Sequence, residues 1–225
     1  MNDPLDNPSV LGKKVGLLGG TFDPVHCGHI EIASRVLEKF NLDSILFIPA
    51  ATPPHKHDHA ITPFAIRREM LEEAVKQYDD FYVTALEAEI SGPSFTIDTL
   101  RRLRNKLRDD VFLMFIIGMD AFRDIATWKD YRELPDLADF AIINRPGYDF
   151  SALDAIICDL PGYFFDPQRG AWISAQSQGA LYPVPVADMD ISSTEIREKV
   201  RNRQSIGNEV PESVASLIVS HSLYH

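Results

Sequence analysis

The most constraining feature of the sequence is a regular alternation of short apolar segments and amphipathic helical segments that begins at Lys14. The segments 15–20 and 111–118 have the length and composition of strands, and the second is apolar throughout, as expected of a central parallel strand covered on both faces. Residues 28–40 and 96–107 instead place their apolar side chains at helical spacing. The alternation predicts a doubly wound α/β fold, with a mostly parallel sheet and helices on both faces.

The remaining segments extend the same pattern. Further strands are predicted at 44–50, 81–90, 139–145 and within 180–189, and further helices from about residue 63, at 191–200 and at 211–223. Residues 148–180 show only weak periodicity. We expect residues 1–14 to form a loose leader and 15–225 to form a single domain that ends in a small helical part.

Composition limits the classes of partner. The chain has 22 Lys and Arg against 33 Asp and Glu, a formal net charge of −11, so we expect neither nucleic acid nor a membrane surface as a partner. The longest strongly apolar run, 111–119, is far shorter than the roughly 20 residues of a membrane helix. The first ten residues lack the features of a signal peptide, and Cys27 and Cys158 form no CxxC pair. A soluble cytoplasmic protein is predicted.

A glycine-rich turn with two histidines lies between the first predicted strand and the first predicted helix. It reads Gly19-Gly20-Thr21-Phe22-Asp23-Pro24-Val25-His26-Cys27-Gly28-His29. Glycines let the backbone approach a ligand, a helix N-terminus favours phosphate, and His26 and His29 can donate hydrogen bonds to phosphate oxygens. A tight turn with ordinary surface histidines is the alternative. Neither GxxxxGK[ST] nor GxGxxG occurs here, so this would be a different phosphate-binding device.

A second candidate for phosphate binding lies near the end of the chain. It reads Ile191-Ser192-Ser193-Thr194-Glu195-Ile196-Arg197. Ser192 and Glu195 have the spacing of a helix capping box, which explains those two residues completely. The capping box leaves Ser193, Thr194 and Arg197 unexplained. Hydroxyls and free N–H groups at a helix N-terminus, with an arginine about one turn inside, could bind a polyphosphate.

A third candidate is the histidine-rich loop Pro53-Pro54-His55-Lys56-His57-Asp58-His59. Its histidines could form a metal cluster, but alternating residues in a proline-flanked loop rarely converge on one ion, and no fourth ligand with zinc-site spacing is visible. We therefore predict no metal site and expect Lys56 to meet phosphate.

Other candidates lie at or after predicted strand ends. Gly118 and Asp120 follow the apolar run 111–118, where a carboxylate can bind ribose hydroxyls or can simply cap a helix. Trp128 suits either the core or a stacking contact with a flat ring. Arg145 ends the predicted strand 139–145 and is either a solvated loop charge or a ligand contact.

Together these segments resemble the bacterial nicotinate-nucleotide adenylyltransferase family. The segments that carry the resemblance are GGTFDPVHCGH, PPHK, SGPSFTIDTL, IIGMDAFRDIATW, NRPG and ISSTEIR, in this order from about Val15 onward. HxGH and ISSTEIR alone indicate a superfamily shared with pantetheine-phosphate adenylyltransferase and the cytidylyltransferases. PPHK, the segment SFTIDTL and Gly118-Met119-Asp120 followed by Trp128 narrow the resemblance to the pyridine-nucleotide branch. Two positions depart from the family pattern: Phe95, where Tyr is frequent, and Asn144, where a second Arg is frequent.

The resemblance implies adenylyl transfer from MgATP to nicotinate mononucleotide, which gives nicotinate adenine dinucleotide and pyrophosphate in NAD biosynthesis. It implies that His26, His29 and Arg197 are catalytic, and that Mg²⁺ is held mainly by ATP phosphates and water. The residues implied to bind ATP are Gly19, Gly20, Thr21, Phe22 and Asp23 through their backbone, with His26, His29, Gly118, Asp120, Ser192, Ser193, Thr194, Ile196 and Arg197. Those implied to contact the acceptor are Lys56, Thr96, Trp128 and Arg145.

Several alternatives stay open at this point. The acceptor could be nicotinamide mononucleotide or phosphopantetheine, because the contacts that discriminate between acceptors can be backbone N–H groups. A non-catalytic nucleotide-binding regulator and a zinc-binding module built on the loop 55–59 belong to other classes. The oligomeric state is also open, with a homodimer among the possibilities.

Overall fold

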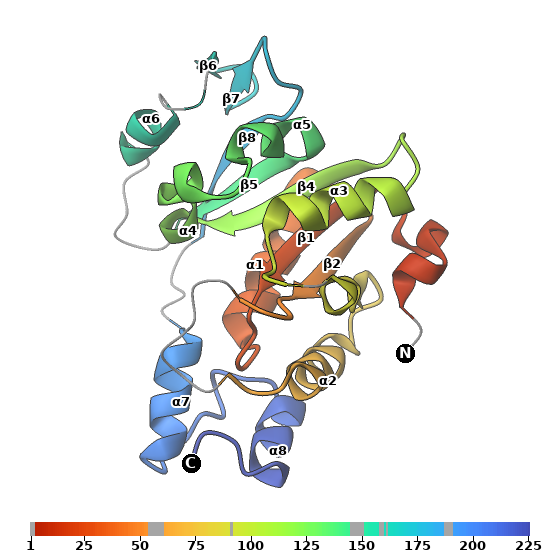
Figure 1. Ribbon diagram of the computed structural model, residues 1–225. Helices are drawn as coiled ribbons and strands as arrows, with labels where there is room; N and C mark the ends of the chain where they lie inside the picture. The colour runs from red at the N-terminus through yellow and green to blue at the C-terminus, as the bar shows by residue number, and fades with distance from the viewer. Residues whose placement is uncertain are drawn as a thin grey trace.

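The computed structural model describes residues 3–53, 61–90, 92–144, 151–157, 160, 162–186 and 191–225. Its centre is an eight-stranded sheet with the strand order β3-β2-β1-β4-β5-β8-β7-β6 (Figure 1). The strands are β1 Lys14–Gly20, β2 Ser44–Pro49, β3 Phe81–Val83, β4 Phe112–Gly118, β5 Asp139–Asn144, β6 Tyr163–Asp166, β7 Ala171–Ser174 and β8 Leu181–Pro185. The first five strands and β8 pair in parallel, whereas β7 and β6 are antiparallel additions at one edge. The predicted doubly wound, mostly parallel sheet is confirmed.

Helices cover both faces of the sheet. They are α1 Cys27–Phe40, α2 Phe64–Val75, α3 Thr96–Lys106, α4 Met119–Arg123, α5 Leu134–Leu137, α6 Ser151–Ile157, α7 Ser193–Arg201 and α8 Glu212–Ser220. Figure 1 shows α3 on one face with α1 on the other, while α7 and α8 lie below the sheet with α8 against α2. Among the described residues, no helix combines the length and the apolar character needed to cross a bilayer.

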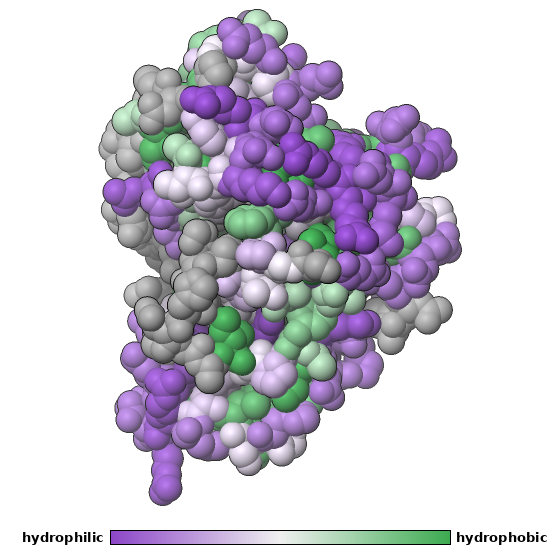
Figure 2. Space-filling view, in the orientation of Figure 1, coloured by the Kyte–Doolittle hydropathy of each residue, from purple (hydrophilic) through white to green (hydrophobic). Residues whose placement is uncertain are grey.

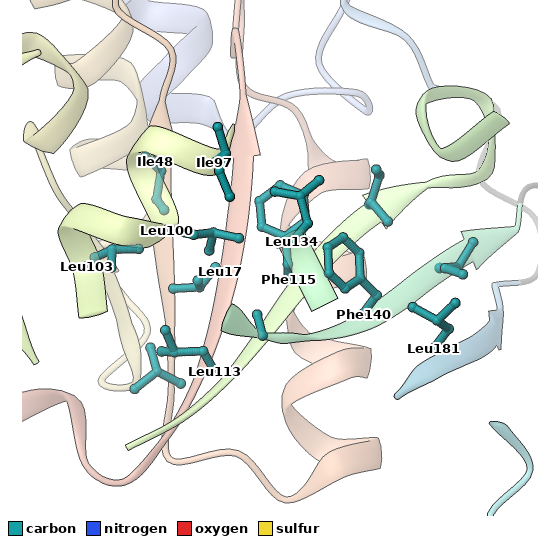
Figure 3. Packing of buried hydrophobic residues seen from close by; sticks show 14 of the residues in the cluster. Leu17, Ile48, Ile97, Leu100, Leu103, Leu113, Phe115, Leu134, Phe140 and Leu181 are labelled. Atoms are coloured by element: carbon teal, nitrogen blue, oxygen red, sulfur yellow. The ribbon is translucent and has the colours of Figure 1, made fainter. Parts of the chain in front are cut away.

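The core is split into two clusters because neighbouring side chains on a strand point to opposite faces. Leu17 of β1 belongs to the cluster beneath α3 and α5, whereas the next residue, Leu18, belongs to the cluster beneath α1, α2 and α8. Figure 3 shows the first cluster, in which Leu100 and Leu103 of α3 pack against Leu17 and its neighbours on the sheet. Burial on both faces explains why β4 is apolar along its whole length.

Strand β3 is shorter than the sequence predicts. The segment 81–90 was predicted as one strand, but β3 ends at Val83 and a 3₁₀ helix occupies Leu86–Glu89. The buried Thr84 side chain is one reason, because its hydroxyl accepts a hydrogen bond from the Leu86 N–H and turns the chain away from the sheet. This turn places Glu87 in the wall of a cavity at the carboxyl ends of β1 and β4.

The segment expected to be a loose leader is ordered over its described part. Two short 3₁₀ helices span Pro4–Asp6 and Pro8–Leu11, and Leu5 and Leu11 are buried in the core. The Asp3 carboxylate accepts hydrogen bonds from the Thr84 hydroxyl and the Ala85 N–H. Residues 3–11 therefore pack against the sheet, and the expectation of a loose leader was wrong for them.

Candidate active site

A cavity of about 410 Å³ lies at the carboxyl ends of β1 and β4. The order of the strands reverses between these two, and ligands bind at such a switch point in open α/β sheets. Residues predicted from the sequence that line the cavity are Gly19, Gly20, Thr21, His29, Thr96, Gly118, Asp120 and Trp128. Strand ends and helix starts thus bring segments from three parts of the sequence to one place.

The two histidines lie together at the start of α1. Their ring centroids are 3.7 Å apart, and the His26 N–H donates to His29 Nδ1 over 3.2 Å. A neutral His29 that accepts at Nδ1 carries its proton on Nε2, which leaves that nitrogen as a donor. A Cβ at Gly28 would lie 3.0 Å from His26 Nδ1, so glycine at this position gives the His26 ring its space.

The N-terminal turn of α7 is attached to the β1–α1 turn. Ser192 caps the helix by accepting from the Glu195 N–H, as its capping-box spacing predicts. Ser193 Oγ donates to the carbonyl of Pro24 over 2.9 Å, and Arg197 Nη1 donates to the carbonyl of Asp23 over 2.7 Å. These two contacts bring together the sequence motifs at 19–29 and 191–197.

Arg197 also donates from Nη2 to the Thr194 hydroxyl over 3.2 Å. Its guanidinium is therefore held at the N-terminus of α7, where helix N–H groups and a positive charge together favour an anion. Ile196 does not share this position. Its side chain is fully buried in the core and its N–H donates to the carbonyl of Ser192. A contact between Ile196 and ATP stays a prediction.

The end of β4 presents a carboxylate at the cavity. Gly118 is the N-cap of α4, and the exposed Asp120 lies in the first turn of that helix. The Asp120 carboxylate folds over the Gly118 backbone so closely that a Cβ at Gly118 would collide with it. A carboxylate in this place can accept hydrogen bonds from the hydroxyls of a ribose.

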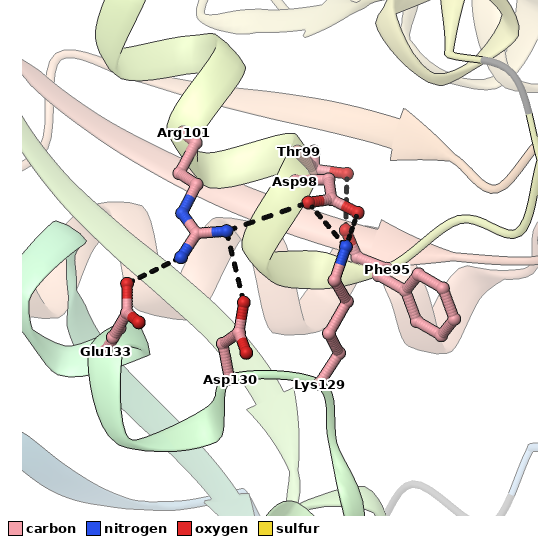
Figure 4. Close-up of polar contacts among 7 residues, drawn as sticks. All are labelled: Phe95, Asp98, Thr99, Arg101, Lys129, Asp130 and Glu133. Atoms are coloured by element: carbon pink, nitrogen blue, oxygen red, sulfur yellow. Dashed lines mark hydrogen bonds and ion pairs between the residues drawn. The ribbon is translucent and has the colours of Figure 1, made fainter.

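The opposite wall of the cavity comes from the start of α3 and the residues after α4. Thr96 and Trp128 both line the cavity, and Trp128 also packs against the core. Next to Trp128, Lys129 Nζ lies 2.7 Å from Asp98 Oδ2 and 5.2 Å from the ring centroid of Phe95 (Figure 4). This contact fixes the position of the Trp128 segment relative to α3.

Arg101 reinforces this wall. Its guanidinium pairs with Asp130 at 3.2 Å and with Glu133, both of which follow Lys129 in the chain. The region is strongly hydrophilic where it faces solvent, and in Figure 2 hydrophilic residues dominate the surface over α3. Exposed ion pairs stabilise little individually, so the contribution of this network is mainly to hold two segments in register.

Glu87 is a buried carboxylate in the wall of the cavity that sequence reasoning did not single out. It is 8% exposed, and Thr99 Oγ1 donates to its Oε1 over 2.8 Å. Burial raises the pKa of the Glu87 carboxyl, while its hydrogen bonds and the positive charge of Arg67 act in the opposite direction. Glu87 was missed because residues 81–90 were predicted to be one strand, and in an edge strand its side chain would have faced solvent.

Arg67 is a second residue that sequence reasoning missed. It is 1% exposed, and its guanidinium donates to the carbonyls of Thr62, Thr21 and Ala50 over 2.8, 2.6 and 2.8 Å. Those carbonyls belong to the segments that follow β1 and β2 and to the segment that precedes α2. The sequence held a signal for it, since Arg67 falls on the apolar stripe of α2 that continues through Met70.

Several predicted residues lie apart from the cavity or outside the described residues. Phe22 and Asp23 are buried at 2% and 5% exposure, so their side chains face inward, consistent with a backbone role in the turn. Lys56 and Arg145 lie outside the described residues, as do His55, His57 and His59. In the described part of the chain, no cluster of three or more His, Cys, Asp or Glu residues could hold a metal ion.

Comparisons with known proteins agree with this geometry. Residues 17–199 match the cytidylyltransferase-like family model. The chain is 40% identical to a Syntrophotalea carbinolica protein over 94% of the chain and 97% of that protein, and 38% identical to a Thermus thermophilus protein over 94% and 99%. Each of these relatives is named "Probable nicotinate-nucleotide adenylyltransferase".

Solved structures agree on the fold. The Plasmodium falciparum nicotinic acid mononucleotide adenylyltransferase complexed with NaAD superposes with a TM-score of 0.73 at 19% identity, over 94% of this chain and 97% of that one. The identity is low enough that this likeness concerns the fold alone. The relatives at 34–40% identity decide the family, because they align along nearly their full length. The chain belongs to the nicotinate-nucleotide adenylyltransferase family.

Proposed function

We propose that the protein transfers the adenylyl group of MgATP to nicotinate mononucleotide, which gives nicotinate adenine dinucleotide and pyrophosphate. The observation that carries the proposal is the junction of two phosphate-binding motifs beside one cavity. His26 and His29 at the start of α1 are tied to the N-terminus of α7 through Arg197 and Ser193. The names of the relatives support the choice of reaction.

The chemistry requires little beyond positioning and charge. The attacking atom is an oxygen of the acceptor 5′-phosphate, which is ionised at neutral pH, so no general base is needed. Charge develops on the oxygens of the ATP α-phosphate during an in-line displacement, and preorganised donors stabilise it. We assign this role to His29 Nε2, with His26 beside it, and we assign Arg197 and the N-terminus of α7 to the β and γ phosphates.

The two ends of the cavity suit the two substrates. On the β1 and β4 side, the backbone of Gly19 to Thr21 and the Asp120 carboxylate line the cavity, and we assign the adenosine and its ribose to them. On the α3 side, Trp128 offers a flat surface for stacking on a pyridine ring, and Thr96 lies at the N-terminus of α3, where N–H groups favour the nicotinate carboxylate. Lys56 and Arg145 are proposed to meet the acceptor phosphate.

Mg²⁺ enters the proposal as part of the MgATP substrate. This hard ion prefers phosphate oxygens and water, and the described residues offer no cluster of three or more ligands to compete with them. We propose a cytoplasmic location as well, which is supported by the free thiol of Cys27. A homodimer stays a proposal that sedimentation of the purified chain would test.

Pyrophosphate release tests the function directly. With MgATP and equal concentrations of nicotinate mononucleotide, nicotinamide mononucleotide or phosphopantetheine, we expect the highest kcat/KM for nicotinate mononucleotide. A higher kcat/KM for either other acceptor would overturn the substrate assignment. Absence of pyrophosphate with every acceptor, together with saturable binding of ATP, would instead indicate a nucleotide-binding regulator.

A further inference from the structure

The Asp23 carboxylate, in the turn before α1, is buried and held by groups from distant parts of the chain. Tyr224 Oη donates to its Oδ1 over 2.7 Å, and the N–H of Thr62 donates to its Oδ2 over 3.2 Å. The positive charge of Arg67 lies close enough to act on it. A buried carboxylate with two donors and a neighbouring cation is strongly fixed in position.

This carboxylate lies where the two catalytic motifs meet. The carbonyl of Asp23 accepts from Arg197, the following carbonyl of Pro24 accepts from Ser193, and His26, the N-cap of α1, lies three residues after Asp23. A shift of the Asp23 side chain would therefore move the turn that presents the histidines. It would also loosen the attachment of α7.

Tyr224 is well placed to prevent such a shift. It follows α8, and its ring packs against the core cluster beneath α1 and α2. Burial raises the pKa of the Tyr224 hydroxyl, so the group remains a donor to Asp23 across the working pH range. Its backbone has φ +66°, a conformation that L residues with side chains adopt rarely and keep where the surroundings require it.

We infer that Tyr224 is a positioning residue for adenylyl transfer, because its hydroxyl fixes the Asp23 carboxylate and thereby the turn that carries His26 and His29. The inference rests on the proposed function. Tyr224 lines no part of the described cavity and acts only through Asp23. Its loss should affect the ATP side of the site and leave the acceptor side, built on α3 and Trp128, unaffected.

The variant Tyr224→Phe removes only the hydroxyl, and Tyr163→Phe is a matched control. Tyr163 is also a partly buried tyrosine, and its hydroxyl donates to the carbonyl of Gly179 over 2.8 Å, in the β6–β7 part of the fold away from the cavity. We expect Tyr224→Phe to lower kcat about tenfold and to raise the KM for ATP severalfold, with the KM for nicotinate mononucleotide unchanged. Tyr163→Phe should keep kcat within twofold of the wild type.

A double-mutant cycle with Asp23→Ala shows whether Tyr224 acts through Asp23. We expect the double variant to have about the kcat of the slower single variant, because each change alone already removes the hydrogen bond between Tyr224 and Asp23. Multiplying effects, or a Tyr224→Phe kcat equal to that of Tyr163→Phe, would overturn the inference.

Affinity for a non-hydrolysable ATP analogue, measured by calorimetry, provides a readout that does not depend on turnover. Tyr224→Phe should weaken binding of this analogue severalfold, whereas Tyr163→Phe should leave it unchanged. Equal affinities in both variants would overturn the inference. An inactive wild type that binds the analogue would refute the proposed function alone, since the comparison of affinities still tests the role of Tyr224.

Discussion

Replacing the buried Arg67 should destabilise the protein far more than replacing its neighbour Arg68. Arg67 donates to the carbonyls of Thr62, Thr21 and Ala50, whereas Arg68 pairs on the surface with Glu72. The two residues share a helix and a side-chain type. They differ in burial and in what they hold together, so the pair isolates the contribution of the buried guanidinium.

The expected magnitude follows from the groups that Arg67→Met would leave behind. Each buried carbonyl without a donor costs about 1–3 kcal/mol, and the lower end applies because two of the three bonds are only partly buried. The Asp23 carboxylate also loses its neighbouring positive charge. We therefore expect the free energy of unfolding to fall by about 3–5 kcal/mol, the range for breaking a buried charged contact.

Urea denaturation of the purified variants measures this difference. Arg68→Met should change the free energy of unfolding by less than about 1 kcal/mol, as exposed ion pairs do. A value for Arg67→Met within about 1 kcal/mol of the wild type would refute the reasoning. It would mean that water or a shifted backbone satisfies the three carbonyls at no cost.

Three further predictions concern Glu87, which lines the cavity, and Gly28 and Lys129, which adjoin its lining residues His29 and Trp128. Burial raises the pKa of the Glu87 carboxyl, so the wild type should lose stability relative to Glu87→Gln as pH rises from the ordinary carboxyl pKa of 4.5 through the folded pKa, and should show no such loss below pH 4.5. Urea titrations from pH 4 to 8 measure the difference in free energy of unfolding between the two proteins. A difference that stays constant over this range would contradict the prediction. Gly28→Ala crowds His26 and should lower kcat at least tenfold while the free energy of unfolding changes by less than about 1 kcal/mol, and unchanged kcat would show that the ring has room. Lys129→Ala should raise the KM for nicotinate mononucleotide severalfold at low salt and less at 0.5 M salt, whereas an equal effect at both would exclude an ionic role.

The alternation of strands and helices was sufficient to predict the fold because each element carries its own periodicity. The β4 run predicted a central strand with both faces buried, and the helical stripe of α3 predicted the surface that packs on the sheet. The 81–90 segment failed because its apolar pattern suits a strand, whereas the local hydrogen bond at Thr84 decides where the strand ends. Local patterns do not reveal such side-chain contacts.

The candidate site was partly predictable for the same reason. His26, His29 and Arg197 belong to short motifs, so phosphate binding could be predicted for them from the sequence. The hydrogen bond from Arg197 to the Asp23 carbonyl, which joins the two motifs, depends on the fold. No sequence pattern marked Tyr224 as part of the site. It carries no motif, and it meets Asp23 only because α8 packs against α2.

The most direct test of the central claim is kcat of His29→Ala with MgATP and nicotinate mononucleotide. His29 lines the cavity and is assigned the hydrogen bond to the developing charge on the α-phosphate. Loss of one such donor lowers kcat by about 10² or more. The His29 ring also contacts Phe22 and accepts from the His26 N–H, so its removal should lower the midpoint of thermal unfolding modestly while unfolding stays cooperative. A kcat at least about 10² below the wild type, with a cooperative unfolding transition, is the result expected. Near-normal turnover would contradict the assignment of this site to adenylyl transfer.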